Sequence, residues 1–347
     1  MSILRWIGLG VGAAMFLYVF FLARRGRSRG LDSIIGMLAG LGLMGISAYP
    51  DAISIVRDML SLEKDQFSRL IAVGIISNIL LWILIVRARL QFTEQADLLD
   101  TLVRRLAVKD FESMYPELEP LTPIVVLIPA YNEQDSIKGV LDKIPESIGG
   151  MKVTVIVIDD GSDDDTAAAV REAGFPAVKC AINRGQGAAL HVGFDIVKRF
   201  GAQIVVTMDA DGQHMPEDME KLVGPIADDE ADFVIGSRIL GDREKDSATR
   251  YVGIHVFNSI IRVLTPIKVT DCSNGYRALR VSTLAKLVLR QAQYQAPEVI
   301  IEAARKGARI GEAPVTVKQR TSGTSKKGRN LKYALYFARS IYKTWLR

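Results

Sequence analysis

Hydrophobic and polar positions divide the chain into a first part with long uncharged runs and a remainder where short apolar runs alternate with helical patterns. Residues 6–23, 33–50 and 70–86 carry no charged side chain over 18, 18 and 17 positions. These lengths approach the roughly 20 residues that a helix needs to cross a bilayer core. The pattern therefore predicts three transmembrane α-helices within a transmembrane domain of residues 1–90.

The alternative for the first run is a cleaved signal peptide, with the other two runs as buried helices. Two further apolar runs follow at once, which favours the membrane interpretation. Gly36 and Gly40 form a GxxxG spacing, and Gly8, Gly10 and Gly12 recur along the first run. Small residues let helices approach closely in lipid, so we expect these glycines to lie at helix contacts.

Arginines are unevenly distributed around the three runs. They gather between the first and second runs and after the third, at Arg24, Arg25, Arg27, Arg29, Arg87, Arg89, Arg104 and Arg105. The loop between the second and third runs mixes both signs of charge. Because positive segments stay on the cytoplasmic side, the sequence predicts an integral membrane protein whose chain from Gln91 onward is cytosolic.

Residues 91–120 are charged and predict an amphipathic linker helix. Its apolar positions at helical spacing are Leu98, Leu99, Leu102 and Leu106. A short coiled-coil seam is the alternative interpretation of this spacing.

The pattern over residues 121–325 predicts an α/β domain. Strand-like runs cover residues 123–130, 152–159, 177–182, 203–209 and 232–238. Helical patterns lie between them at residues 135–143, 164–173, 186–199 and 216–228. This alternation predicts a Rossmann-like, mostly parallel sheet with helices on both faces.

Polar residues follow the predicted strands where each one ends, in the stretches PAYNE, DDGS, DADGQ and GSR. Ligands of such sheets bind beyond the carboxyl ends of the strands. Asp209 and Asp211, with Gln213 nearby, are hard oxygen ligands suited to Mg²⁺ or Mn²⁺ shared with nucleotide phosphates. An acidic pair in a solvated turn is the alternative, and the neighbouring polar strand ends argue against it.

Composition excludes several other classes of protein. Two scattered cysteines form no disulfide framework and fit a reducing compartment, and with three scattered histidines they show no zinc spacing. The net charge of +5 comes from residues beside the apolar runs and at the C-terminus, so anionic lipid, and not nucleic acid, is the expected partner.

The motifs IPAYNE, VIDDGSDDDT, NRGQGAAL, MDADGQH, GSR and DCSNGYRAL occur in this order. Together they resemble the family 2 glycosyltransferases of GT-A fold, most closely the polyprenyl-phosphate (dolichyl-phosphate) mannosyl- and glucosyltransferase branch. The resemblance covers residues 123–327. The N-terminal part resembles a small three-helix membrane family often associated with such enzymes.

The resemblance implies a site for a nucleotide diphosphate sugar. The residues implied to contact the base, the ribose and the diphosphate are Pro129, Ala130, Tyr131, Glu133, Asp159, Asp160, Asp209, Ala210 and Asp211. Asp209, Asp211 and Gln213 would hold the metal.

The later motifs imply an acceptor site for a lipid phosphate. The residues that match are Arg238, Arg250, Arg277 and Arg320. A guanidinium binds a phosphate through two parallel hydrogen bonds. Asp271 lies in the turn that the family places near the sugar, so Asp211, Asp271 and Arg238 are the implied catalytic residues. Asn274 stands where the family more often has serine, which leaves sugar recognition open.

Residues 326–347 carry seven basic and no acidic side chains, interleaved with Tyr333, Tyr336, Phe337, Tyr342 and Trp345. A solvated tail is one interpretation. A basic amphipathic helix on the membrane surface accounts better for the aromatic residues.

The implied reaction transfers a hexosyl unit from a donor of the GDP-mannose or UDP-glucose type to a polyprenyl phosphate, with inversion. Alternatives are another lipid or glycan acceptor in cell-envelope synthesis and a non-catalytic membrane scaffold. A dinucleotide oxidoreductase fits less well because Leu190 stands at the third glycine position. The chain lacks the motifs that a P-loop ATPase, a nucleotidyltransferase or a processive synthase would carry. The sequence leaves open whether copies of the chain form a homo-oligomer.

Overall fold

The computed structural model describes residues 3–25, 30–49, 64–241, 248–318 and 330–347. The chain forms two compact units, Met1–Leu99 with Leu346–Arg347, and Asp100–Trp345. Helix α4 (Lys64–Met114) continues through this division, so the predicted boundary at residue 90 does not coincide with a helix end.

The first unit contains α1 (Ile3–Arg24), α2 (Gly30–Ala48) and the beginning of α4. A Cβ atom on Gly40 would lie 2.8 Å from the carbonyl oxygen of Gly12, and one on Gly36 would lie 2.9 Å from Val19. The α1 and α2 backbones therefore approach closely at Gly12 and Gly40, and Gly36 packs against the Val19 side chain, which confirms the predicted helix contact there. Gly10 faces open space instead.

Within the described residues, one helical stretch, Arg5–Arg24, is both long and apolar enough to cross a membrane. The apolar part of α2, Gly36–Gly45, is shorter. Most side chains of the third predicted crossing, residues 70–86, lie outside what the structure describes. The second and third crossings therefore stay predictions.

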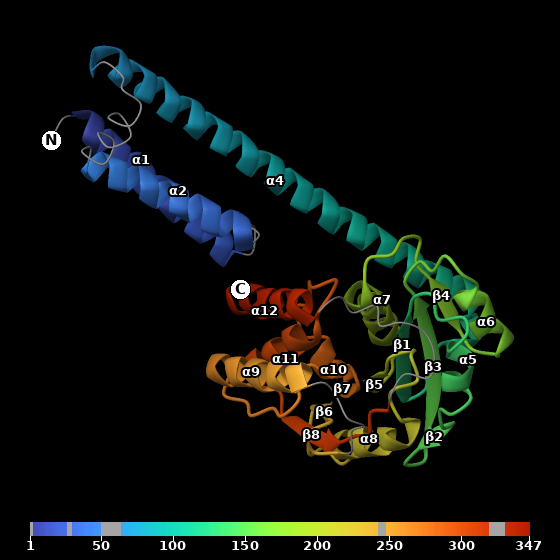
Figure 1. Cartoon of the computed structure of the whole chain (residues 1–347). Helices are drawn as coiled ribbons and strands as arrows, with labels where there is room; N and C mark the ends of the chain where they lie inside the picture. Colours follow the sequence, from blue (N-terminus) through green and yellow to red (C-terminus); the bar gives the residue numbers. More distant parts are fainter. Residues whose placement is uncertain (1–2, 26–29, 50–63, 242–247, 319–329) are drawn as a thin grey trace. The chain divides into compact units, whose positions relative to one another are not determined.

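The second unit is built on an eight-stranded sheet in the order β2-β3-β1-β5-β7-β6-β8, with β4 beside β3 (Figure 1). The strands are β1 (Ile124–Ala130), β2 (Ser147–Ile148), β3 (Met151–Asp159), β4 (Ala177–Lys179), β5 (Ile204–Thr207), β6 (Phe233–Ser237), β7 (Arg277–Arg280) and β8 (Ile310–Pro314). Each of the five predicted strands is present. An α/β fold is thereby confirmed.

The sheet is mixed, whereas the sequence predicted a mostly parallel one. Strand β7 inserts between β5 and β6 and runs antiparallel to both. Its sequence, Arg-Ala-Leu-Arg, has a charged residue at each end of a four-residue strand, so it contains no apolar run from which a strand could be predicted. The pairs β3–β4, β1–β3 and β1–β5 are parallel, and the loops after β1, β3 and β5 carry the predicted polar and acidic motifs.

Helices cover both faces of the sheet, as predicted. They are η1 (Pro116–Leu118), α5 (Ile137–Leu141), α6 (Thr166–Glu172), α7 (Gln186–Arg199), η2 (Pro216–Asp218), α8 (Met219–Ala227), α9 (Ala248–Leu264), α10 (Val281–Leu284), α11 (Ala296–Arg305) and α12 (Asn330–Trp345). Alternate residues of β1 enter two hydrophobic clusters, Val125 and Leu127 with α7, α9, α11 and α12, and Ile124, Val126 and Ile128 with α5, α6 and α8. This alternation is the period-two pattern of a strand that is buried on both faces.

The C-terminal part of α4 packs against the first cluster through a face that the sequence did not identify. Val103, Ala107 and Phe111 are buried there. Leu102 and Leu106, which the predicted amphipathic face contained, are exposed. The helix is apolar on two sides, so spacing alone could not decide which side packs.

Helix α12 packs one face against α9 and α11. Phe337 and Ile341 are buried, and the ring of Phe337 lies 4.6 Å from that of Phe257. Arg305 donates hydrogen bonds to the last carbonyls of the helix, on Thr344 and Trp345. The predicted membrane-surface helix is thus docked on the second unit, with its other face exposed.

The NRGQG stretch lets α7 begin against the loop that precedes α11. Gly185 has φ of 100°, a conformation that favours glycine. A Cβ on Gly187 would lie 2.4 Å from the carbonyl oxygen of Gln291. The amide of Ala188 donates to the carbonyl of Ala292 at 3.0 Å. These glycines therefore serve backbone packing.

We predict that Gly187→Ala lowers the free energy of unfolding of the second unit by about 1–3 kcal/mol, because the new methyl group meets backbone and cannot be accommodated by a rotamer change. Gly224→Ala is the matched control. It lies in α8 with nothing within 4 Å of its Cβ position, so the same change should be neutral or stabilising. Urea unfolding of both variants measures this, and equal stability of the two would contradict the packing argument.

Candidate active site

A pocket of about 410 Å³ opens beyond the carboxyl ends of β1, β3 and β5. Every predicted nucleotide-sugar residue lines it except Asp159. The amide of Asp160 donates to the carbonyl of Ala130 at 2.9 Å, and that of Met208 donates to Leu127 at 3.1 Å. These bonds tie the loops after β3 and β5 to β1, so the motifs converge.

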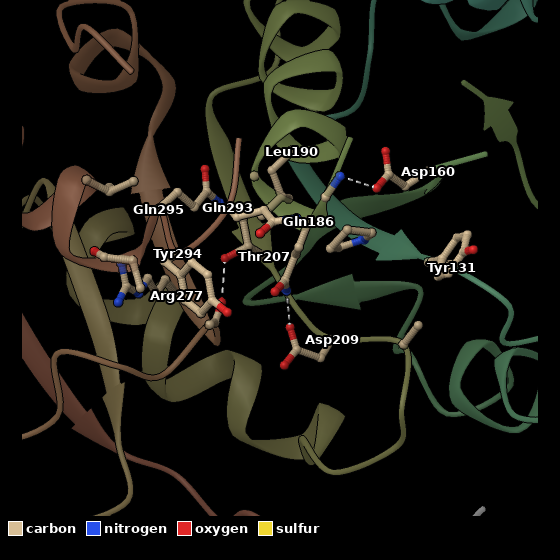
Figure 2. Close-up of a pocket in the computed structure, with 18 of the residues that line it drawn as sticks. Tyr131, Asp160, Gln186, Leu190, Thr207, Asp209, Arg277, Gln293, Tyr294 and Gln295 are labelled. Carbon is tan, nitrogen blue, oxygen red and sulfur yellow. Dashed lines mark hydrogen bonds between the residues drawn. The ribbon is translucent and has the colours of Figure 1, made fainter. Parts of the chain in front are cut away.

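Asp160 lies at one end of the pocket, near Tyr131 (Figure 2). Its carboxylate accepts hydrogen bonds from the backbone amides of Arg184, at 3.1 Å, and Gly185, at 2.6 Å. Burial raises the pKa of Asp160 above its usual range, and these two amides oppose the shift. Asp159 does not line the pocket; it is fully buried, and its Oδ1 accepts the amide of Ser162 at 2.8 Å.

Tyr131 and Glu133 come from the loop after β1. The hydroxyl of Tyr131 donates to Asp163 at 3.2 Å, and this hydrogen bond, with the charge of Asp163, raises the pKa of Tyr131. Glu133 accepts the hydroxyl of Ser136 at 2.6 Å. Both side chains remain part of the pocket wall.

The loop after β5 brings Asp209 and Asp211 to the same pocket. Figure 2 shows Gln186 reaching from the first turn of α7 to Asp209, with 2.6 Å between its Nε2 and Oδ1 of the aspartate. Asp211 is buried and accepts the amide of Gln213 at 3.2 Å. Gln213 does not line the pocket, because its Nε2 donates to the carbonyl of Lys318 at 3.0 Å.

The donor set fits a hard divalent cation. Within the described part of the chain, no three His, Cys, Asp or Glu side chains gather into a metal-binding cluster. Two carboxylates on one loop are nevertheless what Mg²⁺ requires when phosphates and water complete its coordination. Asp209 and Asp211 suit an ion that arrives with a diphosphate.

His214 is a residue of this loop that the sequence analysis did not assign. Its Nδ1 accepts the amide of Asp209 at 3.2 Å, so its Nε2 carries the proton and donates to Oδ1 of Asn274 at 3.1 Å. The imidazole also stacks on Tyr276, with ring centroids 4.8 Å apart. His214 thereby connects the acidic loop to the 271–276 turn. Its place at the end of the DADGQH motif was the available signal.

Asn274 stands where the resemblance more often has serine, and the structure gives it a definite role. Its Nδ2 donates to the carbonyl of Gly236 at 2.7 Å, and its Oδ1 accepts from His214 and from the amide of Tyr276. Asn274 therefore holds the turn against β6 and against His214.

Arg238 and Asp271 form a buried ion pair outside the pocket lining. Their Nε and Oδ2 atoms lie 2.6 Å apart, and Nη2 and Oδ1 lie 2.8 Å apart. Burial alone would raise the pKa of Asp271, but the Arg238 guanidinium, by hydrogen bond and charge, holds it below its usual range. Such a pair rigidifies the start of the turn, and the assignment of both residues to catalysis stays a prediction.

Arg277 lines the pocket, but backbone carbonyls accept from all three of its nitrogens. Nε donates to Asn274 at 2.6 Å, Nη1 to Ala296 at 2.7 Å and Nη2 to Cys272 at 2.9 Å. It therefore joins the turn to the start of α11. Of the other two predicted phosphate ligands, Arg250 has a side chain outside what the structure describes, and Arg320 lies outside the described residues.

Glu298 is a second residue whose role only the structure reveals. It is fully buried, and its two carboxylate oxygens accept the amides of Arg290, at 2.9 Å, and Gln291, at 2.8 Å. It fixes the loop that carries Gln293, Tyr294 and Gln295 into the pocket.

The fold is that of the GT-A class. Among solved structures, one similar to this chain is glucosyl-3-phosphoglycerate synthase from Mycobacterium tuberculosis in complex with Mn²⁺, UDP-glucose and phosphoglyceric acid. It is 19% identical with a TM-score of 0.50, covering 69% of this chain and 83% of that one, and it shows the fold.

Sequence comparisons give the family. A family model described as Glycosyl transferase family 2 matches residues 125–288. A UDP-N-acetylglucosamine–dolichyl-phosphate N-acetylglucosaminyltransferase of Methanococcus voltae is 34% identical over 55% of this chain and 84% of its own length. The polyprenol monophosphomannose synthase of Mycolicibacterium smegmatis is 31% identical over 63% of this chain and 86% of its own. The chain belongs to the family 2 glycosyltransferases.

We predict that Asp271→Asn lowers the free energy of unfolding by about 3–5 kcal/mol, because it leaves the buried Arg238 charge without a partner. The double variant Arg238→Met with Asp271→Leu should recover most of this loss. The pKa of Asp271 is lower in the folded protein than in the unfolded chain, where it is about 4. The ion pair therefore stabilises the fold fully above about pH 4, and this stabilisation is lost as the pH falls through the pKa of the folded state. Asp271→Asn should therefore flatten the acid limb of the stability profile.

Unfolding midpoints measured across acid to neutral pH, together with turnover, test this assignment. A variant Asp271→Asn that is as stable as the unmodified protein but has lost turnover would restore Asp271 to the catalytic set.

Proposed function

We propose that the protein transfers a hexosyl unit from a nucleotide diphosphate sugar, of the GDP-mannose or UDP-glucose type, to a polyprenyl phosphate with inversion. The observation that carries this proposal is the single pocket in which the loops after β1, β3 and β5 meet. The relatives' names support the acceptor class, since they act on dolichyl phosphate and polyprenol, and a further relative, 34% identical, is an undecaprenyl-phosphate mannosyltransferase of Micrococcus luteus.

The donor would lie across the pocket from its base to its diphosphate. Tyr131, Glu133 and the buried Asp160 are suited to the base and ribose, since they present hydrogen-bonding groups at one end of the pocket. Asp209 and Asp211 would hold a divalent cation, Mg²⁺ or Mn²⁺, with Gln213 a further candidate through its side-chain oxygen. That ion supplies charge neutralisation for the leaving diphosphate.

The acceptor needs little activation. A phosphate monoester has a second pKa near 6, so its oxygen is already anionic at neutral pH. Catalysis then depends on holding this oxygen in line with the anomeric carbon. Asp271 is poorly placed to act as a base, because its pKa is held low and Arg238 occupies its carboxylate.

The acceptor's phosphate is assigned to Arg250 and Arg320. Arg238 and Arg277 would support phosphate binding indirectly. The guanidinium of Arg238 binds Asp271, and that of Arg277 donates to three backbone carbonyls. A lipid phosphate reaches the enzyme from a membrane, so we assign residues 6–23, 33–50 and 70–86 to three crossings with the transferase domain in the cytosol. The exposed face of α12, with Leu335, Tyr342 and Trp345, is suited to the membrane surface.

Incubating membranes that contain the protein with labelled nucleotide sugars and polyprenyl phosphate tests the reaction. We expect label in a lipid that releases its sugar on mild acid treatment, and no label when polyprenol without phosphate replaces the acceptor. Label in another lipid or in a glycan would favour a different acceptor. Donor binding without any transfer would favour the non-catalytic scaffold.

We predict that Asp211→Asn weakens Mn²⁺-dependent binding of the nucleotide diphosphate by at least about tenfold, because one hard ligand and one negative charge are lost. Asp228→Asn, an exposed change at the end of α8, is the matched control and should bind normally. Calorimetric titration with and without Mn²⁺ measures both. Undiminished metal-dependent binding by Asp211→Asn would place the metal elsewhere.

A further inference from the structure

The pocket has a second end whose chemistry differs from that of the base end. Figure 2 shows Gln293, Tyr294, Gln295 and Arg277 on the opposite side of Gln186 from Asp160 and Tyr131. Apolar side chains of the same pocket come from α7, β7, α11 and α12, and they are Leu190, Phe194, Leu279, Val299 and Phe337. We call the part around Gln293, Tyr294 and Gln295 the amide chamber.

Most polar groups of the amide chamber are side-chain amides. Gln186, Gln293 and Gln295 contribute them, and an amide both donates and accepts hydrogen bonds. Among the described residues that line the whole pocket, Arg277 is the one cation, and three backbone carbonyls accept from its nitrogens. The hydroxyl groups of a sugar would therefore find both donors and acceptors in the chamber.

Gln295 has an unsatisfied group in this chamber. Its Oε1 is buried and has no hydrogen-bond partner among the residues that the structure describes. A buried amide oxygen without a partner destabilises a protein, and native structures rarely leave one without a ligand or water. The amide can turn about its last side-chain bond and so meet either a donor or an acceptor.

The loop around Gln295 is held from several sides, so the unsatisfied amide is not the result of a loose segment. Glu298 accepts the amides of Arg290 and Gln291. Ser340 of α12 donates to the carbonyl of Tyr294 at 2.9 Å, and the ring of Tyr294 stacks on Tyr336. Tyr294 itself has φ of 53°, a left-handed conformation uncommon for a non-glycine residue. Strained backbone maintained by its surroundings is frequent at ligand sites.

We propose that the amide chamber binds the transferred sugar and that Gln295 hydrogen-bonds one of its hydroxyl groups. This inference rests on the proposed function for its donor, a nucleotide diphosphate sugar. The chamber lies next to Asp209, where the diphosphate would end and the sugar begin. Gln295 thus selects the sugar, while the base end selects the nucleotide.

Binding measurements on the full-length protein test this directly. For the nucleotide that binds, calorimetry with Mn²⁺ present compares the dissociation constants of the free diphosphate and of its hexose derivative. UDP and UDP-glucose form one pair, and GDP and GDP-mannose form the other. We expect the hexose derivative to bind about fivefold to tenfold more tightly than the free diphosphate, since it adds a hydrogen bond to Gln295.

The variant Gln295→Leu should bind the free diphosphate normally and lose about fivefold to tenfold in affinity for the hexose derivative, as expected for one lost hydrogen bond. Gln291→Leu is the matched control in the same loop, because its side chain does not line the pocket. An unchanged ratio of hexose to free-diphosphate affinity in Gln295→Leu would overturn the assignment.

Two outcomes separate this inference from the proposed function. If the protein binds the hexose derivative through Gln295 but transfers nothing to polyprenyl phosphate, the proposed acceptor fails and the sugar assignment stands. If Gln295→Leu leaves donor binding intact and raises only the Michaelis constant for polyprenyl phosphate, the chamber belongs to the acceptor and the sugar assignment fails.

Discussion

The parallel register of β1 with β3 and β5 is the constraint on which the site depends. Ala130 pairs with Asp159, and Leu127 pairs with Thr207, so the three strands deliver their following loops to one edge. These loops are distant in sequence, and the motif in each one is weak evidence by itself, but together they line one pocket at that edge. A slip in this register would separate Asp160 from the two metal-binding candidates, Asp209 and Asp211.

A second set of contacts holds the 271–277 segment beside the pocket in place. The Arg238–Asp271 pair, the His214–Asn274 hydrogen bond and the three carbonyl contacts of Arg277 all converge on the 271–277 segment. Each group is buried, so removal of either partner leaves a polar group without compensation. These contacts fix the geometry of the turn, and the assignment of Arg238 and Asp271 to catalysis stays a prediction.

The sequence predicted the features that depend on local patterns. Five strands were recognisable from β-branched runs, and the acidic loops from their place after those runs. The sequence did not predict the features that depend on pairing between distant parts of the chain. Strand β7 is short and ends in arginines, Arg238 is 33 residues from Asp271, and α4 is apolar on two sides. Gln295 and Glu298 could not be assigned, because a partner or its absence is visible only in three dimensions.

The central claim is that the acceptor's own phosphate oxygen displaces the diphosphate in one step, with no enzyme nucleophile. The geometry favours this, since the one carboxylate of the 271–277 turn, Asp271, is locked to Arg238 and lies off the pocket. Determination of the anomeric configuration of the lipid-linked product by nuclear magnetic resonance tests it most directly. From an α-linked donor the account predicts a β-linked sugar phosphate, and an α-linked product would contradict direct displacement.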